Sequence, residues 1–169
     1  MKNRMGKLER QLFAAAQARG VEVVRQGDLR DWLRLSPTQE SGVFHRLAAA
    51  GWIARVRRGL YLVPPKLPLG GKWSPDEAQA LNALIGDKGG HYQVCGPNAF
   101  QRYGFDGQIP TRVFAYNNRL SGERKIGGVN LRLIKVADAR LGGTDTVMTA
   151  SGAELVYSSM ARTLVDAVD

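Results

Sequence analysis

The stretch ARVRRGLYLV, residues 54–63, contains three arginines within four positions of an otherwise apolar run. These are Arg55, Arg57 and Arg58. A guanidinium group is permanently charged and carries a planar set of N–H donors, so it suits the binding of phosphate groups. Arg55 and Arg57 alternate with Ala54 and Val56, as in a strand with one packed and one exposed face. We expect Ala54 and Val56 to pack on helices and the arginines to point outward, beside a turn near Gly59.

Positive charge is concentrated at the start of the sequence. The chain has 169 residues and a formal net charge of +9; residues 1–63 contain 12 Lys and Arg against 5 Asp and Glu, whereas residues 64–169 contain 12 against 10. A concentrated positive field attracts polyanions, so nucleic acid is the first candidate partner, ahead of an acidic membrane surface or an acidic protein. A basic face that only interacts with solvent is the alternative.

Helices must position these arginines. Apolar residues at helical spacing predict a helix over residues 6–20 and a second, short helix in GDLRDWLRL, residues 27–35, with a short strand between them. After a tight turn, Ser36 is expected to cap a third helix, with Pro37 at its first position and Gln39 completing a capping box. Two helices joined by so short a turn have helix-turn-helix geometry.

The third helix, predicted to reach Gly51, has two unlike faces. One face carries Val43, Phe44 and Leu47, and the other is small and polar. A small polar face fits the major groove of DNA, where Ser, Thr, Gln or Arg side chains can hydrogen-bond base edges. The candidate DNA-binding residues of this helix are Ser36, Thr38, Gln39, Ser41, His45 and Arg46. A solvated helix face, with His45 as an ordinary surface residue, is the alternative.

The order helix, helix, turn, helix, hairpin predicts a winged helix-turn-helix. In this arrangement the hairpin lies beside the helix that enters the groove, so its arginines reach phosphates or an adjacent minor groove. Charge, tight turn, polar helix face and arginine hairpin together predict binding to double-stranded DNA. A three-helix module whose hairpin serves protein association remains open.

A linker divides the sequence into two expected domains. Four prolines and a Gly-Gly pair between residues 63 and 77 interrupt periodic structure. We place a winged helix-turn-helix domain at residues 1–63, a linker at 64–73 and an α+β domain at 74–169. The first helix of the second domain is expected to begin with Ser74 as its cap and Glu77 as the partner in a capping box.

The second domain is predicted to be a small mixed α/β fold with antiparallel strands. HYQVC, residues 91–95, resembles a strand followed by a short helix, whereas residues 111–118 and 129–136 resemble the two strands of a hairpin. The loop between these two strands carries Arg119, Arg124 and Lys125. We favour a solvated turn over a nucleic-acid contact for this loop. Residues 144–150 and 153–159 are further strand candidates.

Catalytic and cofactor-binding motifs are missing from the sequence. It has no Walker-type Gly-Lys-Ser/Thr, no G-x-G-x-x-G after a strand, no H-E-x-x-H and no G-x-S-x-G. The one cysteine, Cys95, follows His91 by four residues and is better explained as a small buried hydrophobe than as a nucleophile. An acidic metal cluster would have to be assembled from Asp138, Asp145, Glu154 and Asp166. We expect no enzyme activity, catalytic residue, metal site or cofactor.

No stretch has the length and apolar character of a membrane span, and the basic start lacks the apolar core of a signal peptide. A single cysteine fits a reducing compartment, because it cannot form an intramolecular disulfide. We therefore expect a cytoplasmic protein without a membrane partner.

Four stretches occur in an order and at a spacing found in a known family. They are RRGLYLVP (57–64), VCGPNAFQRYGF (94–105), QIPTRVFAYNNRLSG (108–122) and SSMARTLVDAVD (158–169). Over nearly the whole chain they resemble the AbiEi-type antitoxins and transcriptional regulators of abortive-infection, phage-defence systems. Two features depart from the family. Met160-Ala161 stand where it usually has Pro-Glu, and the sequence stops at Asp169 within a predicted helix, so the second domain is expected to be truncated.

The resemblance implies a repressor that binds inverted repeats in the promoter of its own operon. It also implies that the rest of the chain neutralises a co-encoded nucleotidyltransferase-like toxin without forming a stable complex, the type IV arrangement. Whether two copies dimerise or occupy neighbouring half-sites as monomers is open. A nucleic-acid-processing enzyme that docks through a winged helix, and a protein-protein adaptor, are the rival functions.

Overall fold

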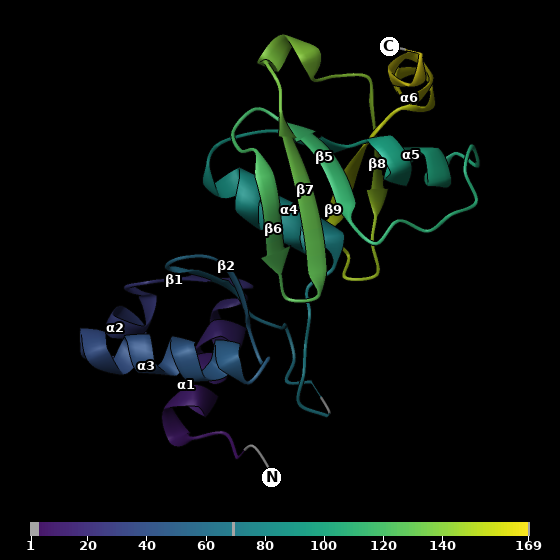
Figure 1. Ribbon diagram of the computed structural model, residues 1–169. Coiled ribbons are helices and arrows are strands. Elements are labelled where there is room, and N and C mark those ends of the chain that lie inside the picture. Colours follow the sequence, from purple (N-terminus) through teal and green to yellow (C-terminus); the bar gives the residue numbers. More distant parts are fainter. Residues whose placement is uncertain (1–3, 69, 169) are drawn as a thin grey trace. The chain divides into compact units, whose positions relative to one another are not determined.

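A computed structural model describes residues 4–68 and 70–168, and the chain divides into two compact units, Met1–Pro75 and Asp76–Asp169 (Figure 1). The described part of the first unit holds the helices α1 (Lys7–Arg19), α2 (Asp28–Leu33) and α3 (Pro37–Ala49) and the strands β1 (Val23–Arg25), β2 (Ala54–Arg57) and β3 (Leu60–Leu62). The strands pair antiparallel in the order β1-β3-β2. Each helix and strand predicted for this unit is present, close to the predicted bounds.

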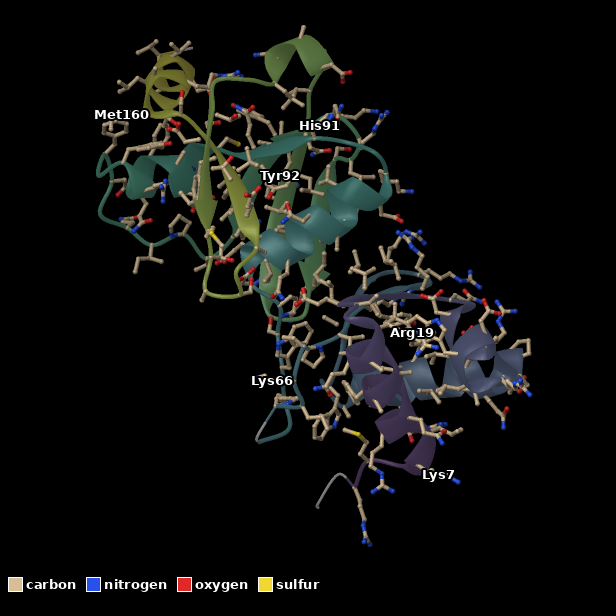
Figure 2. All side chains as sticks on the ribbon, turned by 180° about the vertical axis from the view of Figure 1, so that it is seen from behind. Lys7, Arg19, Lys66, His91, Tyr92 and Met160 are labelled. Atoms are coloured by element: carbon tan, nitrogen blue, oxygen red, sulfur yellow. The ribbon has the colours of Figure 1, made fainter. Side chains whose placement is uncertain are left out.

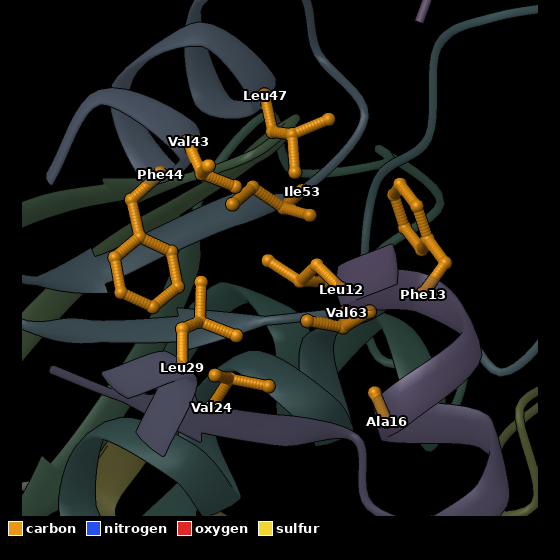
Figure 3. Packing of buried hydrophobic residues seen from close by; sticks show 10 residues of the cluster. All are labelled: Leu12, Phe13, Ala16, Val24, Leu29, Val43, Phe44, Leu47, Ile53 and Val63. Carbon is orange, nitrogen blue, oxygen red and sulfur yellow. The ribbon is translucent and has the colours of Figure 1, made fainter. Parts of the chain in front are cut away.

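The first unit is built around one apolar core to which all three helices contribute (Figure 3). The core residues are Leu12, Phe13, Ala16, Val24, Leu29, Val43, Phe44, Leu47, Ile53 and Val63. α1 ends at Gly20, which has a φ of 62°, a left-handed conformation that glycine adopts without steric cost. The turn between β2 and β3 likewise has its positive φ, 80°, at Gly59. The predicted end of the first helix at Gly20 and the predicted turn near Gly59 are therefore confirmed.

The second unit has a six-stranded mixed sheet with helices packed on it. Its elements are α4 (Glu77–Asp87), β4 (Tyr92–Val94), α5 (Gly96–Arg102), β5 (Val113–Asn117), β6 (Gly122–Ile126), β7 (Val129–Lys135), a 3-10 helix η1 (Asp138–Arg140), β8 (Thr144–Met148), β9 (Glu154–Ser158) and α6 (Met160–Ala167). The strand order is β6-β7-β5-β4-β9-β8. The α+β class and the antiparallel strands are confirmed, although β4 with β9 and β5 with β7 pair in parallel.

Helix α4 begins two residues later than predicted. Asp76, not Ser74, is its cap: the Asp76 side chain accepts from Gln79 N, and the Gln79 side chain accepts from Asp76 N. Thr149 Oγ1 also donates to Asp76 Oδ2 at 2.6 Å, which fixes the carboxylate from outside the helix. Burial alone would raise the pKa of Asp76, but the hydrogen bonds from Ser151, Thr149 and the Gln79 backbone hold it below its usual value.

The predicted hairpin of residues 111–118 and 129–136 is wrong. β5 and β7 do lie next to each other, but they run parallel. The residues between them form a further strand, β6, which makes a hairpin with β7 through Gly127 and Gly128. Asn117 permits the preceding turn, because its Oδ1 accepts from the backbone N–H groups of Arg119 and Leu120. Two of the basic residues assigned to the loop, Arg124 and Lys125, therefore lie on β6.

The last helix, α6, has its apolar residues exposed. Met160, Leu164 and Val165 are 49%, 50% and 55% exposed. Its polar side faces the unit, where Arg162 bonds to Asp166 at 2.9 Å and lies over the ring of Tyr116. Asp169, where the sequence ends, lies outside the described residues. None of the helices in the described part of the chain is long and apolar enough to cross a membrane.

Candidate nucleic-acid interface

Helix α3 separates an apolar from a polar face as its sequence predicts. Val43, Phe44 and Leu47 are buried in the core of the first unit. The six candidate DNA-binding residues are all exposed: Ser36, Thr38, Gln39, Ser41, His45 and Arg46. Such a face can offer hydroxyl, amide and imidazole groups to a duplex without a bulky apolar side chain in the way.

Two of these six residues build the start of the helix. Ser36 Oγ accepts from Gln39 N at 3.1 Å, and Gln39 Oε1 accepts from Ser36 N at 2.9 Å, so the predicted capping box is confirmed. These bonds satisfy two backbone donors that the first turn would otherwise leave without partners. Ser36 and Gln39 therefore have a structural task in the protein itself.

Arg46 is engaged by an acidic residue of α1. Its Nε donates to Glu9 Oε1 at 2.6 Å, and the side chains of Arg46 and Glu9 are 56% and 10% exposed. Burial would raise the pKa of Glu9, but the Arg46 hydrogen bond, a bond from its own backbone N–H and the Arg46 charge hold that pKa below its usual value. The pair ties the C-terminal half of α3 to the first turns of α1.

Sequence reasoning missed Glu40, the other acidic residue that holds α3. Glu40 is 1% exposed and accepts from the backbone N–H groups of Gly27, Leu29 and Arg30 at the start of α2. The Arg30 guanidinium also lies 3.3 Å from Glu40 Oε1. A signal was present in the sequence: Glu40 precedes Val43, Phe44 and Leu47 by three, four and seven positions, which places an acid on the buried stripe.

The face of the β2–β3 hairpin that meets the helices is the opposite of the one predicted. Tyr61 stacks on Phe44 of α3, with ring centroids 4.3 Å apart, and pairs with Arg55 on one side and Val24 on the other. Directly paired residues point to the same face of a sheet, so Arg55 lies on the helix side. Ala54 is buried, but on the opposite face, where it pairs with Leu62. Alternation in the sequence distinguishes the two faces of a strand without indicating which of them meets the helices.

A register shift between Arg55 and Arg57 separates the arginines of the hairpin. Arg57 pairs with Leu60 instead of continuing the register, which leaves Val56 as an added residue of a β-bulge. Leu60 and Tyr61 are successive residues of β3 and point to opposite faces, so Arg57 and Arg55 no longer share one face. Arg57 Nη1 donates to the backbone oxygen of Arg58 at 2.7 Å. Arg55, Arg57 and Arg58 are all exposed, and Arg55 is the arginine on the side of α3.

The groups considered for other chemistry do not come together. His91, the residue before β4 (Figure 2), is exposed, whereas Cys95 is buried, with an exposure of 1%. Burial raises the pKa of the Cys95 thiol to about 12, as expected of a small hydrophobe. Over residues 4–68 and 70–168, no three His, Cys, Asp or Glu side chains gather as a metal site would require, and the four acidic candidates do not form one.

Comparison with known proteins supports a regulator for the first unit. Residues 10–64, from α1 to just beyond β3, match the family described as "Transcriptional regulator, AbiEi antitoxin". A transcriptional regulator is therefore the class of protein that this stretch is similar to. The resemblance to the AbiEi antitoxin and transcriptional-regulator family is confirmed for residues 10–64.

Among solved structures, the RV2827C protein from Mycobacterium tuberculosis is similar to this chain, with a sequence identity of 16% and a TM-score of 0.49. The similarity covers 81% of this chain and 48% of that protein, so the chain spans about half of its length. A comparison with curated proteins finds no match.

Proposed function

We propose that the first unit is a winged helix-turn-helix that binds double-stranded DNA. Helix α3 lies in the major groove in this proposal, and the β2–β3 hairpin, the wing, contacts the neighbouring backbone. The observation that carries it is the exposed polar face of α3, with Arg55 exposed on the side of the hairpin that faces the helices, in a stretch that matches a family of transcriptional regulators. Residues 64–73 then serve as a linker to an antitoxin domain at residues 74–169.

The residues proposed to contact DNA have different tasks. Thr38, Ser41 and His45 are exposed on α3 and are the proposed readers of base edges. Arg55, Arg57 and Arg58 are the proposed phosphate contacts, with Arg55 closest to the groove-binding helix by its place on the sheet. Ser36, Gln39 and Arg46 act mainly by holding α3, through the capping box and the bond to Glu9.

The wider role follows from the resemblance. We propose that the protein is a cytoplasmic repressor that binds inverted repeats in the promoter of its own operon. The second unit, in this proposal, counteracts a nucleotidyltransferase-like toxin from the same operon, without a stable complex. Support for this role comes from the family match over residues 10–64 and from the sequence likeness in the second half.

The proposal is tested by binding of the full chain to the DNA directly upstream of its gene. An unrelated duplex of the same length and base composition is the control. A sequence-specific regulator is expected to bind the upstream DNA at least about 1,000-fold more tightly than the control at physiological salt. Equal affinity for the two duplexes would contradict the proposal. Repression of a reporter by the same upstream region, and rescue of cells that express the adjacent toxin gene, test the two wider roles separately.

A further inference from the structure

Glu40 is a buried carboxylate that belongs to α3 but binds the start of α2. Its Oε2 accepts from Gly27 N at 2.9 Å, Leu29 N at 3.0 Å and Arg30 N at 3.2 Å, and its Oε1 also lies 2.9 Å from Gly27 N. The Glu40 side chain is 2% exposed, and the Arg30 side chain that pairs with it is 41% exposed. The acid therefore has little access to solvent or to a DNA surface.

These bonds supply a cap that α2 lacks. The first N–H groups of a helix have no partner within the helix, and Gly27, the N-cap of α2, has no side chain to offer. A carboxylate is the favoured partner there, because the N-terminal end of a helix carries partial positive charge. A buried carboxylate in turn needs several hydrogen bonds to offset the loss of water. Helix α2 and Glu40 thus depend on each other.

The short turn that joins α2 to α3 contains a residue in an unfavourable backbone conformation. Arg34, which ends α2, has a φ of 54°, a left-handed conformation that is unfavourable for a residue with a side chain. The turn is completed by Leu35 and Ser36 before α3 begins at Pro37. A strained turn of this length can persist only if other contacts hold the helices that it joins. The hydrogen bonds of Glu40 supply such a contact, because they join α3 to the start of α2, the end of that helix away from the turn.

We propose that Glu40 is a positioning residue for DNA binding: it fixes the orientation of α3 relative to α2, and thereby the face that α3 presents to base edges. The inference rests on the proposed function. Base-edge hydrogen bonds depend on the orientation of the helix, whereas phosphate attraction depends chiefly on charge. Disturbing Glu40 should therefore reduce discrimination between DNA sequences more than it reduces general affinity.

Two variants separate geometry from charge. Glu40→Asp keeps the charge and shortens the side chain by one methylene, and Glu40→Gln keeps the size but loses the charge. Glu22→Gln is the matched control for the second variant, because it makes the same change of charge at an exposed residue of this unit. All are used as full chains, at a temperature at which circular dichroism finds each of them folded.

The deciding quantity is the affinity for the upstream duplex divided by the affinity for the unrelated duplex. We expect Glu40→Asp to lower the ratio of specific to non-specific affinity by roughly fivefold or more, the loss that corresponds to about one misplaced base-edge contact. The slope of affinity against salt should stay that of the wild type, because no phosphate contact is lost. Amide hydrogen exchange at Gly27, Leu29 and Arg30 should accelerate. Glu40→Gln should change the ratio in the same direction, and Glu22→Gln should leave it unchanged.

The inference is overturned if the ratio for folded Glu40→Asp equals that of the wild type. This outcome includes an equal fall in specific and non-specific affinity, since Glu40 would then only stabilise the fold. A wild type that does not prefer the upstream duplex is a different result, because it removes the proposed function itself. If Glu40→Gln does not fold, Glu40→Asp decides alone.

Discussion

At the scale of single residues, Arg46 is the one whose role in the structure differs most from the role predicted from the sequence. Its position on the outward face of α3 predicts a base contact, but its Nε donates to the buried Glu9 of α1. An arginine held in this way acts on DNA mainly through the helix that it positions. The ion pair links α3 to α1 as Glu40 links α3 to α2, so both partners of α3 are held by acidic side chains in a unit that is otherwise basic.

The Glu9–Arg46 pair predicts an acid-dependent loss of stability. The pKa of Glu9 is lowered in the folded protein, so its ionised form stabilises the fold above the unfolded-state pKa, and this contribution disappears as the pH falls through the folded-state value, below about 4.5. Glu9→Gln should be less stable than wild type at pH 7 by roughly 0.5–1 kcal/mol, as for a partly exposed pair. Urea unfolding at pH 7 and at pH 3 should give a difference that shrinks at the lower pH. A difference equal at both pH values would contradict the assignment.

Cys95 is predicted to be chemically inert in the folded protein. Its side chain is buried, and burial raises the pKa of the thiol to about 12, so almost no reactive thiolate is present at pH 8. A thiol-specific reagent should label Cys95 in urea but not in buffer. Labelling in buffer at the rate found in urea would show an accessible thiol and reopen the question of a nucleophile.

At the scale of elements, the capping box of α3 is both a local signal and a source of stability. Ser36→Ala removes the acceptor of the Gln39 N–H and should lower the free energy of unfolding by about 1 kcal/mol. Thr38→Ala, in the same turn but without a cap bond to lose, is the control. Chemical unfolding monitored by circular dichroism measures both. Equal stabilities of the two variants would mean that Ser36 contributes no cap in solution.

Elements with local signals could be predicted, and those that depend on distant partners could not. Pro37 with Ser36 and Gln39 defines the start of α3, and Gly20 and Gly59 define where the chain turns. β5 and β7 can pair in parallel because the residues between them form β6, which pairs antiparallel with β7 on its other edge. The alternation of apolar and polar residues identifies strands but does not show this pairing. The helix-facing side of the hairpin was predicted wrongly for the same reason: Tyr61 meets Phe44 only in the folded unit.

The sequence predicted which residues of the candidate site are exposed better than it predicted what each of them does. The candidate residues of α3 and the three arginines are exposed, as helical and strand periodicity suggest, but the arginines do not share the one outward face that was predicted for them. Glu40 was missed because a charged residue on an apolar stripe is usually assigned to the surface. Its function depends on the backbone N–H groups of Gly27 and Leu29, which only the packing of α2 on α3 brings within reach.

At the scale of the whole molecule, charge is unevenly divided between the halves of the chain. Residues 1–63, which contain all the proposed DNA contacts, carry 12 basic and 5 acidic residues, and the rest of the chain is close to balanced. A polyanion should therefore be attracted mainly by the first unit, with an affinity that falls as the salt concentration rises, because the release of counterions on binding is then less favourable. The second unit should contribute little to that dependence.

The most direct test of this account is the salt dependence of duplex binding by the wild type, by Arg55→Ala and by Lys88→Ala. Lys88→Ala removes the same charge from an exposed position of the second unit. If the α3 side of the hairpin contacts DNA, Arg55→Ala should weaken binding and reduce the slope of log affinity against log salt by about one unit, while Lys88→Ala retains the wild-type slope. Equal slopes for all three proteins would contradict a DNA contact at Arg55, and with it the proposed interface.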